Sequence, residues 1–169
     1  MKEKPYLEFK PGEEAAEILF NWWKMLNEAD KSGRAQLKRC ATIEEIVFIQ
    51  VYHVLLHKLQ IGYRVNRERL AAMAGIIAHI KFDSPEIAVA KLFAAPKTGG
   101  KAARLKGLRF RKLLKNKSHE DLFSDLRKGL KIIDSTANVV GLANDVYRWN
   151  DYVKKQWAFD YYSVAPEEK

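Results

Sequence analysis

Two histidines four residues apart, His53 and His57, are the most direct candidates for metal chemistry in this sequence. On a helix this spacing places both imidazoles on one face, as in zinc proteases. Those enzymes also need a glutamate directly after the first histidine as general base, and Val54 stands there instead. No cysteine or acid close by in sequence completes a set of three or four ligands. The pair is interpreted as part of a polar stripe with Gln50 and Gln60, and no metal is predicted.

The only cysteine, Cys40, is the one candidate for thiol chemistry. Its neighbours Lys38 and Arg39 could lower the pKa of the thiol. No motif ties a general base to it, and His79 and His119 stand alone, so a buried or incidental thiol is favoured. A single cysteine forms no internal disulfide, which indicates a reducing, cytoplasmic location.

Residues 96–101, Pro-Lys-Thr-Gly-Gly-Lys, resemble a phosphate-binding loop only superficially. A Walker loop needs a serine or threonine after its lysine to hold magnesium, and Ala102 follows Lys101. The acids are scattered without a paired-carboxylate motif. The sequence therefore predicts a protein that is not an enzyme and that needs no cofactor.

Positive charge is concentrated in one part of the chain. The 169 residues carry a net charge of +9, yet residues 87–119 contain ten basic side chains and no acid, while the rest carries 20 basic and 21 acidic ones. Single-sign fields destabilise a compact state through self-repulsion. This run is interleaved with leucine and phenylalanine, so it belongs in part to a folded element. We expect a surface that binds a polyanion, and nucleic acid is the polyanion favoured.

Membrane insertion is not predicted. The longest uncharged stretch, Ile46–His57, has 12 residues, whereas a membrane span needs about 18 or more apolar ones. The first ten residues have neither an apolar core nor a small-residue cleavage site, so no signal peptide is expected.

Helical periodicity runs along almost the whole sequence. Seven helical segments are expected, over approximately residues 11–26, 42–60, 66–80, 84–94, 102–116, 118–134 and 136–162. Thr42, Asn66, Ser84 and Ser118 stand at capping positions. These signals predict an all-α fold, a compact helical bundle of about six or seven helices with no strands. One domain is expected over residues 1–169, with the bundle at 11–162 and short flexible ends.

Burial patterns predict which helix is central and which aromatic side chains are buried. The segment 42–60 is apolar on most sides, so it is expected at the centre of the core. The four tryptophans occupy apolar helical positions and are interpreted as core residues rather than as exposed base-stacking platforms.

The segment 102–116 is expected to form a basic helix. Arg104, Arg111 and Lys115 lie at helical spacing on one face. Lys112 flanks this face, and Lys101, Lys106 and Arg109 broaden the charge. Smaller basic groups lie at residues 34–39 and 154–155.

Motifs spread along the chain resemble a known family. They are Trp22-Trp23-x-x-Leu26, Ser32-Gly-Arg-Ala-Gln-Leu-Lys-Arg39, Gly107-Leu-Arg-Phe-Arg-Lys-Leu-Leu114, Asp121–Leu130, Leu142-x-x-Asp145-x-x-x-Trp149 and Val153–Tyr162. In this order they are similar to CasB, the small subunit of the type I-E CRISPR Cascade complex. The resemblance covers residues 18–162, nearly the whole chain.

The resemblance implies an all-α, non-enzymatic protein that acts in antiviral defence. Its expected partners are target DNA strands, guide RNA, the other Cascade subunits and a second copy in a head-to-tail pair. The basic surface of the family holds separated strands of the R-loop, where backbone contacts can stabilise an otherwise balanced strand exchange. Carried over position by position, with Arg104 added by charge alone, the nucleic-acid-binding residues are Arg34, Lys38, Arg39, Arg104, Arg109, Arg111, Lys112, Lys154 and Lys155.

Two other classes of function remain open at this point. A free-standing helical transcription regulator would need a helix-turn-helix with a reading helix and a dimer that reads spaced half-sites. A basic helical enzyme acting on nucleic acid would need catalytic acids, which no motif supplies.

Overall fold

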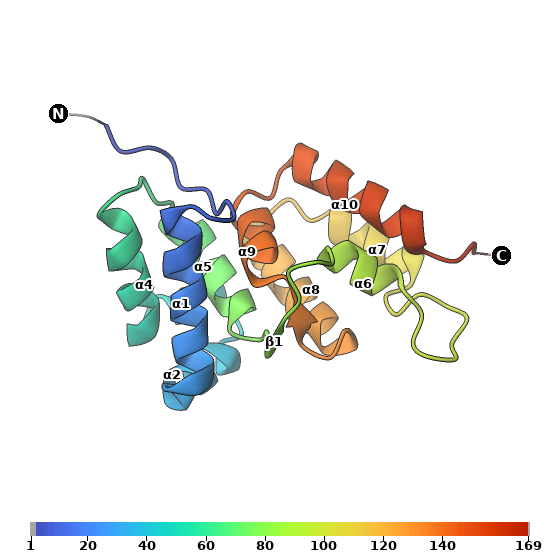
Figure 1. Cartoon of the computed structure of the whole chain (residues 1–169), viewed down its shortest axis with the longest axis horizontal. Coiled ribbons are helices and arrows are strands. Elements are labelled where there is room, and N and C mark those ends of the chain that lie inside the picture. The colour runs from blue at the N-terminus through green and yellow to red at the C-terminus, as the bar shows by residue number, and fades with distance from the viewer. Residues whose placement is uncertain (1–2, 169) are drawn as a thin grey trace.

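The chain folds into α-helices joined by short connections (Figure 1). The structure is a computed structural model that describes residues 3–168. In that range the helices are α1 Glu14–Glu28, α2 Lys31–Arg39, α3 Ile43–Ile46, α4 Gln50–Gln60, α5 Arg67–Ile77, α6 Val89–Ala94, α7 Gly107–Leu114, α8 His119–Ile132, α9 Val139–Tyr147 and α10 Asp151–Val164. The all-α prediction is broadly confirmed, but ten helices exceed the six or seven expected.

One very short sheet was not predicted. Strand β1 (Phe82–Asp83) pairs in parallel with β2 (Thr136–Ala137). With two residues in each strand, no alternation of apolar and polar side chains could reveal it in sequence. It joins the connection after α5 to the connection after α8.

Three of the predicted helix caps are present. Thr42, Asn66 and Ser118 accept hydrogen bonds from backbone N–H groups three residues on, at 3.3, 3.0 and 3.1 Å. The cap expected at Ser84 is wrong, because the Ser84 N–H donates instead to the Ala137 carbonyl and α6 begins only at Val89.

Two segments expected to form one helix each, the second with a possible kink, are divided into separate helices. The segment 42–60 divides at Val47–Ile49, where Ile49 is extended and Phe48 is 87% exposed. The His53 imidazole binds the Val47 carbonyl, which the break leaves without a helical partner. The segment 136–162 divides after Tyr147, and the Asn150 side chain caps α10. Side-chain groups that satisfy the exposed backbone make both breaks possible.

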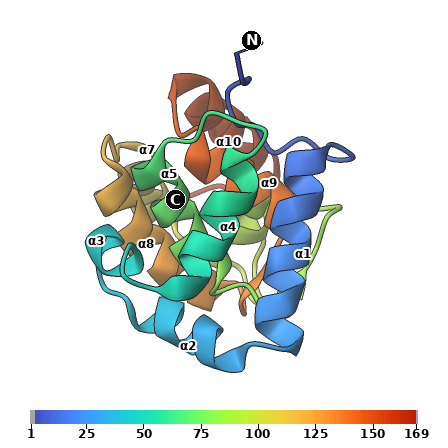
Figure 2. The ribbon, with the colours of Figure 1, turned by 90° about the vertical axis from the view of Figure 1, so that its left-hand side faces the viewer.

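The centre of the core is α5 rather than the segment 42–60. Every residue from Leu70 to Ile77 is buried, and α5 packs against α3, α4, α8 and α9. Alanine and glycine make up half of that run, so neighbouring helices can approach closely on several sides. Helix α4 lies outside α5 (Figure 2) and leaves Val54 exposed, because it is covered on one face only.

Aromatic packing ties α7 to α10. The Phe110 and Tyr161 rings stack with centroids 3.9 Å apart, and the Tyr161 hydroxyl donates to the Leu105 carbonyl at 2.5 Å. All four tryptophans are buried, as predicted. Helix α7 is shorter than the expected 102–116, because a bridge between Pro96 and Ala103 holds the preceding residues in a loop.

Candidate nucleic-acid interface

Helix α2 carries the first predicted basic group. The Asp30 side chain caps the helix by accepting from the Gly33 N–H at 2.8 Å. Arg34 is half-buried and its Nε donates to the Ala78 carbonyl at 3.0 Å. Lys38 and Arg39 are exposed in the last turn.

Helix α8 and the connection after α5 bring further cations to α2. Arg127 donates from Nη2 to the Lys38 carbonyl at 3.5 Å. Desolvation lowers the pKa of Lys38, and the positive charges of Arg34, Lys131 and Lys81 lower it further, which shows how close these groups lie. We call Arg34, Lys38, Lys81, Arg127 and Lys131 the α2–α8 cluster. Among residues 3–168, none of the five forms an ion pair.

A buried histidine lies against this cluster. His79 is 7% exposed, and its Nε2 has no hydrogen-bond partner in the described part of the chain. Burial lowers the pKa of His79 to about 4, and the neighbouring charges of Arg127, Lys38, Lys131 and Arg34 contribute to the shift. The imidazole is therefore neutral at neutral pH.

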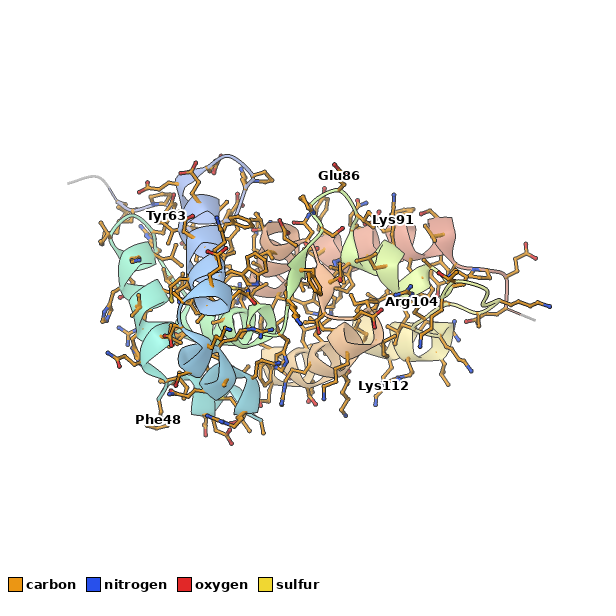
Figure 3. The ribbon with its side chains drawn as sticks, turned by 60° about the horizontal axis from the view of Figure 1, so that its bottom comes forward. Phe48, Tyr63, Glu86, Lys91, Arg104 and Lys112 are labelled. Atoms are coloured by element: carbon orange, nitrogen blue, oxygen red, sulfur yellow. The ribbon has the colours of Figure 1, made fainter. Side chains whose placement is uncertain are left out.

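Helix α7 carries a second basic group beside α8. Arg109 and Lys112 are exposed and line a cavity of about 110 Å³ together with Lys128 of α8. One acid, Asp125, shares this cavity, and its Oδ2 accepts from Asn116 at 2.8 Å. Lys112 points outward on this side of the molecule (Figure 3).

Consecutive residues of α8 join the two groups. Arg127 contacts α2, and Lys128 lines the cavity next to α7. In Figure 3 the helices α2, α8 and α7 follow one another along the same edge. We call the α2–α8 cluster together with Arg109, Lys112 and Lys128 the basic face.

Sequence reasoning did not single out the members of the basic face on α8. Three acids in the first half of α8 mask its charge, so no single-sign run is visible. A usable signal exists, because Arg127, Lys128 and Lys131 all follow the last acid of the helix, Asp125. Lys81 stands alone in sequence and carries no such signal.

Two predicted residues are paired with acids. Arg111 lies 3.6 Å from a carboxylate oxygen of Glu168. Hydrogen bonding by Tyr162 and the charge of Glu168 raise the pKa of Arg111, and desolvation opposes this shift. Arg104 lies 3.6 Å from Asp134 and its side chain is only 25% exposed. The expected face of Arg104, Arg111 and Lys115 on one helix is wrong, because residue 104 lies in the loop before α7.

The third predicted group lies apart from the basic face. Helix α10 follows the upper edge of the molecule in Figure 1, whereas α2 lies at the lower edge. Lys154 is half-buried, with its Nζ 5.8 Å from the centre of the Trp149 ring. Lys155 is exposed beside Phe159 and Tyr162.

The residues first considered for catalysis or metal binding are not assembled into a site. Within residues 3–168, no group of three or more His, Cys, Asp and Glu side chains could hold a metal ion. The thiol of Cys40 is buried, and desolvation followed by the charge of Glu45 raises its pKa, which outweighs the opposite effect of Arg39. The pKa-lowering environment that the flanking residues suggested is therefore not formed.

None of the helices in the described range is both long enough and apolar enough to cross a bilayer.

Comparisons with known proteins identify a family that matches the sequence and a solved structure with a similar fold. The family described as CRISPR-associated protein Cse2 matches residues 33–162. A chain of a crystal structure of E. coli Cascade bound to a PAM-containing double-stranded DNA target is similar in fold, with a TM-score of 0.67 and 16% identity. The likeness covers 86% of this chain and 95% of that one. No curated protein sequence matches the chain.

Proposed function

The chain belongs to the CRISPR-associated Cse2 family, and on this premise we propose that it is a non-enzymatic subunit of a Cascade complex. It binds the backbone of nucleic acid and thereby stabilises the R-loop in antiviral defence in the cytoplasm. Family membership disfavours the alternative of a free-standing transcription regulator.

The continuity of the basic face is the observation that carries this proposal. Eight cations from α2, α7, α8 and the connection before β1 lie along one side, joined at Arg127 and Lys128. A subunit that stabilises separated strands must neutralise phosphates but need not read bases. Lysine and arginine without an ordered set of base-reading side chains meet that requirement.

The remaining predicted residues have other roles in the proposed nucleic-acid interface. Arg39 extends the basic face at the end of α2. Arg104 and Arg111 contribute positive field from α7 and the loop before it, reduced by their acidic partners Asp134 and Glu168. Lys154 and Lys155 form a separate backbone contact on the α10 edge.

The proposed partners are target DNA, guide RNA, the other Cascade subunits and a second copy in a head-to-tail pair. Exposed aromatic side chains support protein contacts at both ends of the molecule, with Phe48 87% and Phe159 73% exposed. A single domain is proposed as well, supported by one cluster of buried residues that extends from Leu7 to Tyr161.

Charge reversal on α7 tests the nucleic-acid assignment. The double variant Arg109→Glu/Lys112→Glu changes two exposed side chains that make no hydrogen bond or ion pair with described residues. Its far-UV circular dichroism should match that of the unmodified protein. Its affinity for a single-stranded oligonucleotide should fall, and the slope of log affinity against log salt should decrease by about 1.4, because each phosphate contact contributes about 0.7.

The matched control reverses two exposed lysines on other helices, Lys24→Glu/Lys58→Glu. It carries the same change in net charge but should keep the salt slope. A second measurement uses Cascade reconstituted with each variant and follows R-loop formation. Equal affinity, slope and R-loop yield in the two double variants would show that the basic face is not the nucleic-acid interface.

A further inference from the structure

The α2–α8 cluster is a concentration of positive charge that the described chain does not compensate. Its five cations come from three separate parts of the sequence. None of them forms an ion pair within residues 3–168. Like charges held together destabilise a fold through repulsion. An anionic ligand would relieve this repulsion, so the cluster has the electrostatics of an anion site.

Backbone contacts hold the cluster in position. Arg34 is anchored through Nε to the Ala78 carbonyl, and Arg127 through Nη2 to the Lys38 carbonyl. The indole N–H of Trp23 donates to the Ile80 carbonyl at 2.9 Å and fixes the connection between His79 and Lys81. Each anchored guanidinium keeps further N–H groups for a ligand, and such pre-organised donors lose little freedom on binding.

Two buried nitrogen atoms, one in the α2–α8 cluster and one against it, lack hydrogen-bond partners among residues 3–168. The Nε2 atom of His79 and the Nε atom of Arg127 are both buried, and neither has a hydrogen-bond partner among residues 3–168. Buried polar atoms are normally satisfied, so an orphaned atom calls for an explanation. A ligand that accepts hydrogen bonds and carries negative charge would satisfy both donors.

We propose that His79, Arg34, Lys38, Lys81, Arg127 and Lys131 form a binding site for one phosphate group. The two arginines supply charge-assisted hydrogen bonds in a fixed geometry, and the lysines supply mobile positive charge at the rim. The His79 imidazole, as its Nε2–H tautomer, donates a neutral hydrogen bond. The phosphate is either a backbone diester of nucleic acid or a free phosphate ion. The diester version rests on the proposed function, and the free-ion version does not.

The neutral state of the imidazole suits this role. The pKa of about 4 means that His79 adds a donor at neutral pH without adding to the repulsion among the cations. The charges that face it are Arg34 and Lys38 from α2 and Arg127 and Lys131 from α8. A bound phosphate would offset them and raise the pKa of the imidazole, which provides a spectroscopic signature.

The test follows the His79 side-chain resonances by NMR while inorganic phosphate or a single-stranded oligonucleotide is added at constant ionic strength. Binding at the site should shift these resonances and raise the pKa of His79, whereas chloride should do neither. The variant Lys81→Gln/Lys131→Gln changes only exposed side chains. It should weaken the affinity with which the added phosphate or oligonucleotide shifts the His79 resonances by about tenfold. The control Lys24→Gln/Lys58→Gln should not weaken it.

The outcomes separate this proposal from the proposed function. A response to the oligonucleotide supports the diester version, and a response to inorganic phosphate alone supports the free-ion version. If the oligonucleotide binds and depends on Arg109 and Lys112 but leaves His79 unchanged, the phosphate site is overturned while the function stands. If neither probe changes His79, or if the Lys81→Gln/Lys131→Gln variant responds like its control, the phosphate site is likewise overturned.

Discussion

The Glu168 carboxylate lies 3.6 Å from the Arg111 guanidinium, on the segment that follows α10. Glu168 also reaches the start of α7, where its side chain fills the space beside Gly107. An acid thus occupies a place on α7 that a phosphate could take. Both side chains are about half exposed, so water and salt screen the pair.

Removing the charge of Glu168 should strengthen nucleic-acid binding modestly. For Glu168→Gln we expect an increase in affinity for single-stranded DNA of less than about fivefold at low salt, because exposed ion pairs are weak. Fluorescence anisotropy measures the change. The control Glu86→Gln removes an exposed acid that lies on the opposite side of the view from Lys112 (Figure 3). It should increase the affinity for single-stranded DNA less than Glu168→Gln does. Equal effects would mean that Glu168 acts only through net charge.

Lys128 should behave as a member of the basic face although it lies outside the basic run of the sequence. We expect Lys128→Gln to lower the salt slope for single-stranded DNA by about 0.7, the contribution of one phosphate contact. Lys58→Gln, an exposed lysine on α4, should leave the slope unchanged. An unchanged slope in Lys128→Gln would remove α8 from the interface next to α7.

Asp145 should make the folded protein less stable as pH rises. Desolvation raises the pKa of Asp145 from 3.8 to about 6; the hydrogen bond from Trp157 opposes this shift, and the charge of Asp160 adds to it. Between these values the folded state binds more protons than the unfolded state, so the free energy of unfolding decreases from pH 4 to pH 6. The decrease from this group is at most about 3 kcal/mol.

Two substitutions at Asp145 separate charge from hydrogen bonding. Asp145→Asn removes the ionisation while keeping an acceptor for the Trp157 indole N–H, which donates to Asp145 at 2.7 Å. Urea denaturation should show that this variant is more stable than the unmodified protein at pH 7 and lacks its part of the pH dependence. Asp145→Ala leaves the indole N–H unpaired and should lose about 1–3 kcal/mol relative to Asp145→Asn. A variant Asp145→Asn with an unaltered pH profile would contradict the raised pKa.

Gly75 should resist substitution because two side chains occupy the space of a Cβ atom. An alanine there would overlap Ile46 of α3 and Phe123 of α8. Overpacking of this kind costs about 1–3 kcal/mol, which exceeds the gain of about 1 kcal/mol in helix propensity. We therefore expect Gly75→Ala to lower the free energy of unfolding, measured by urea denaturation. Gly62→Ala meets no atom within 4 Å and serves as the control.

Local sequence determined the helical class and much of the burial. Caps at Asn66 and Ser118, together with apolar spacing, predict where helices begin and which faces are buried, because both depend on residues within one or two turns. The same information failed at Phe48 and Trp149. At Phe48 the break is satisfied by the His53 imidazole, which binds the Val47 carbonyl and which no capping pattern signals. At Trp149 the break also involves a partner outside the local segment, the Asn116 carbonyl that accepts from the Trp149 indole.

The basic run at residues 87–119 was visible in sequence, but the interface was not. Arg127 and Lys38 are 89 residues apart, and Arg111 and Glu168 are 57 apart. Whether a cation joins a shared surface or is paired with an acid depends on which helix faces become neighbours. That choice is made by the packing of α8 against the small residues of α5 and of α10 against α7, since long-range contacts alone fix the relative positions of helices.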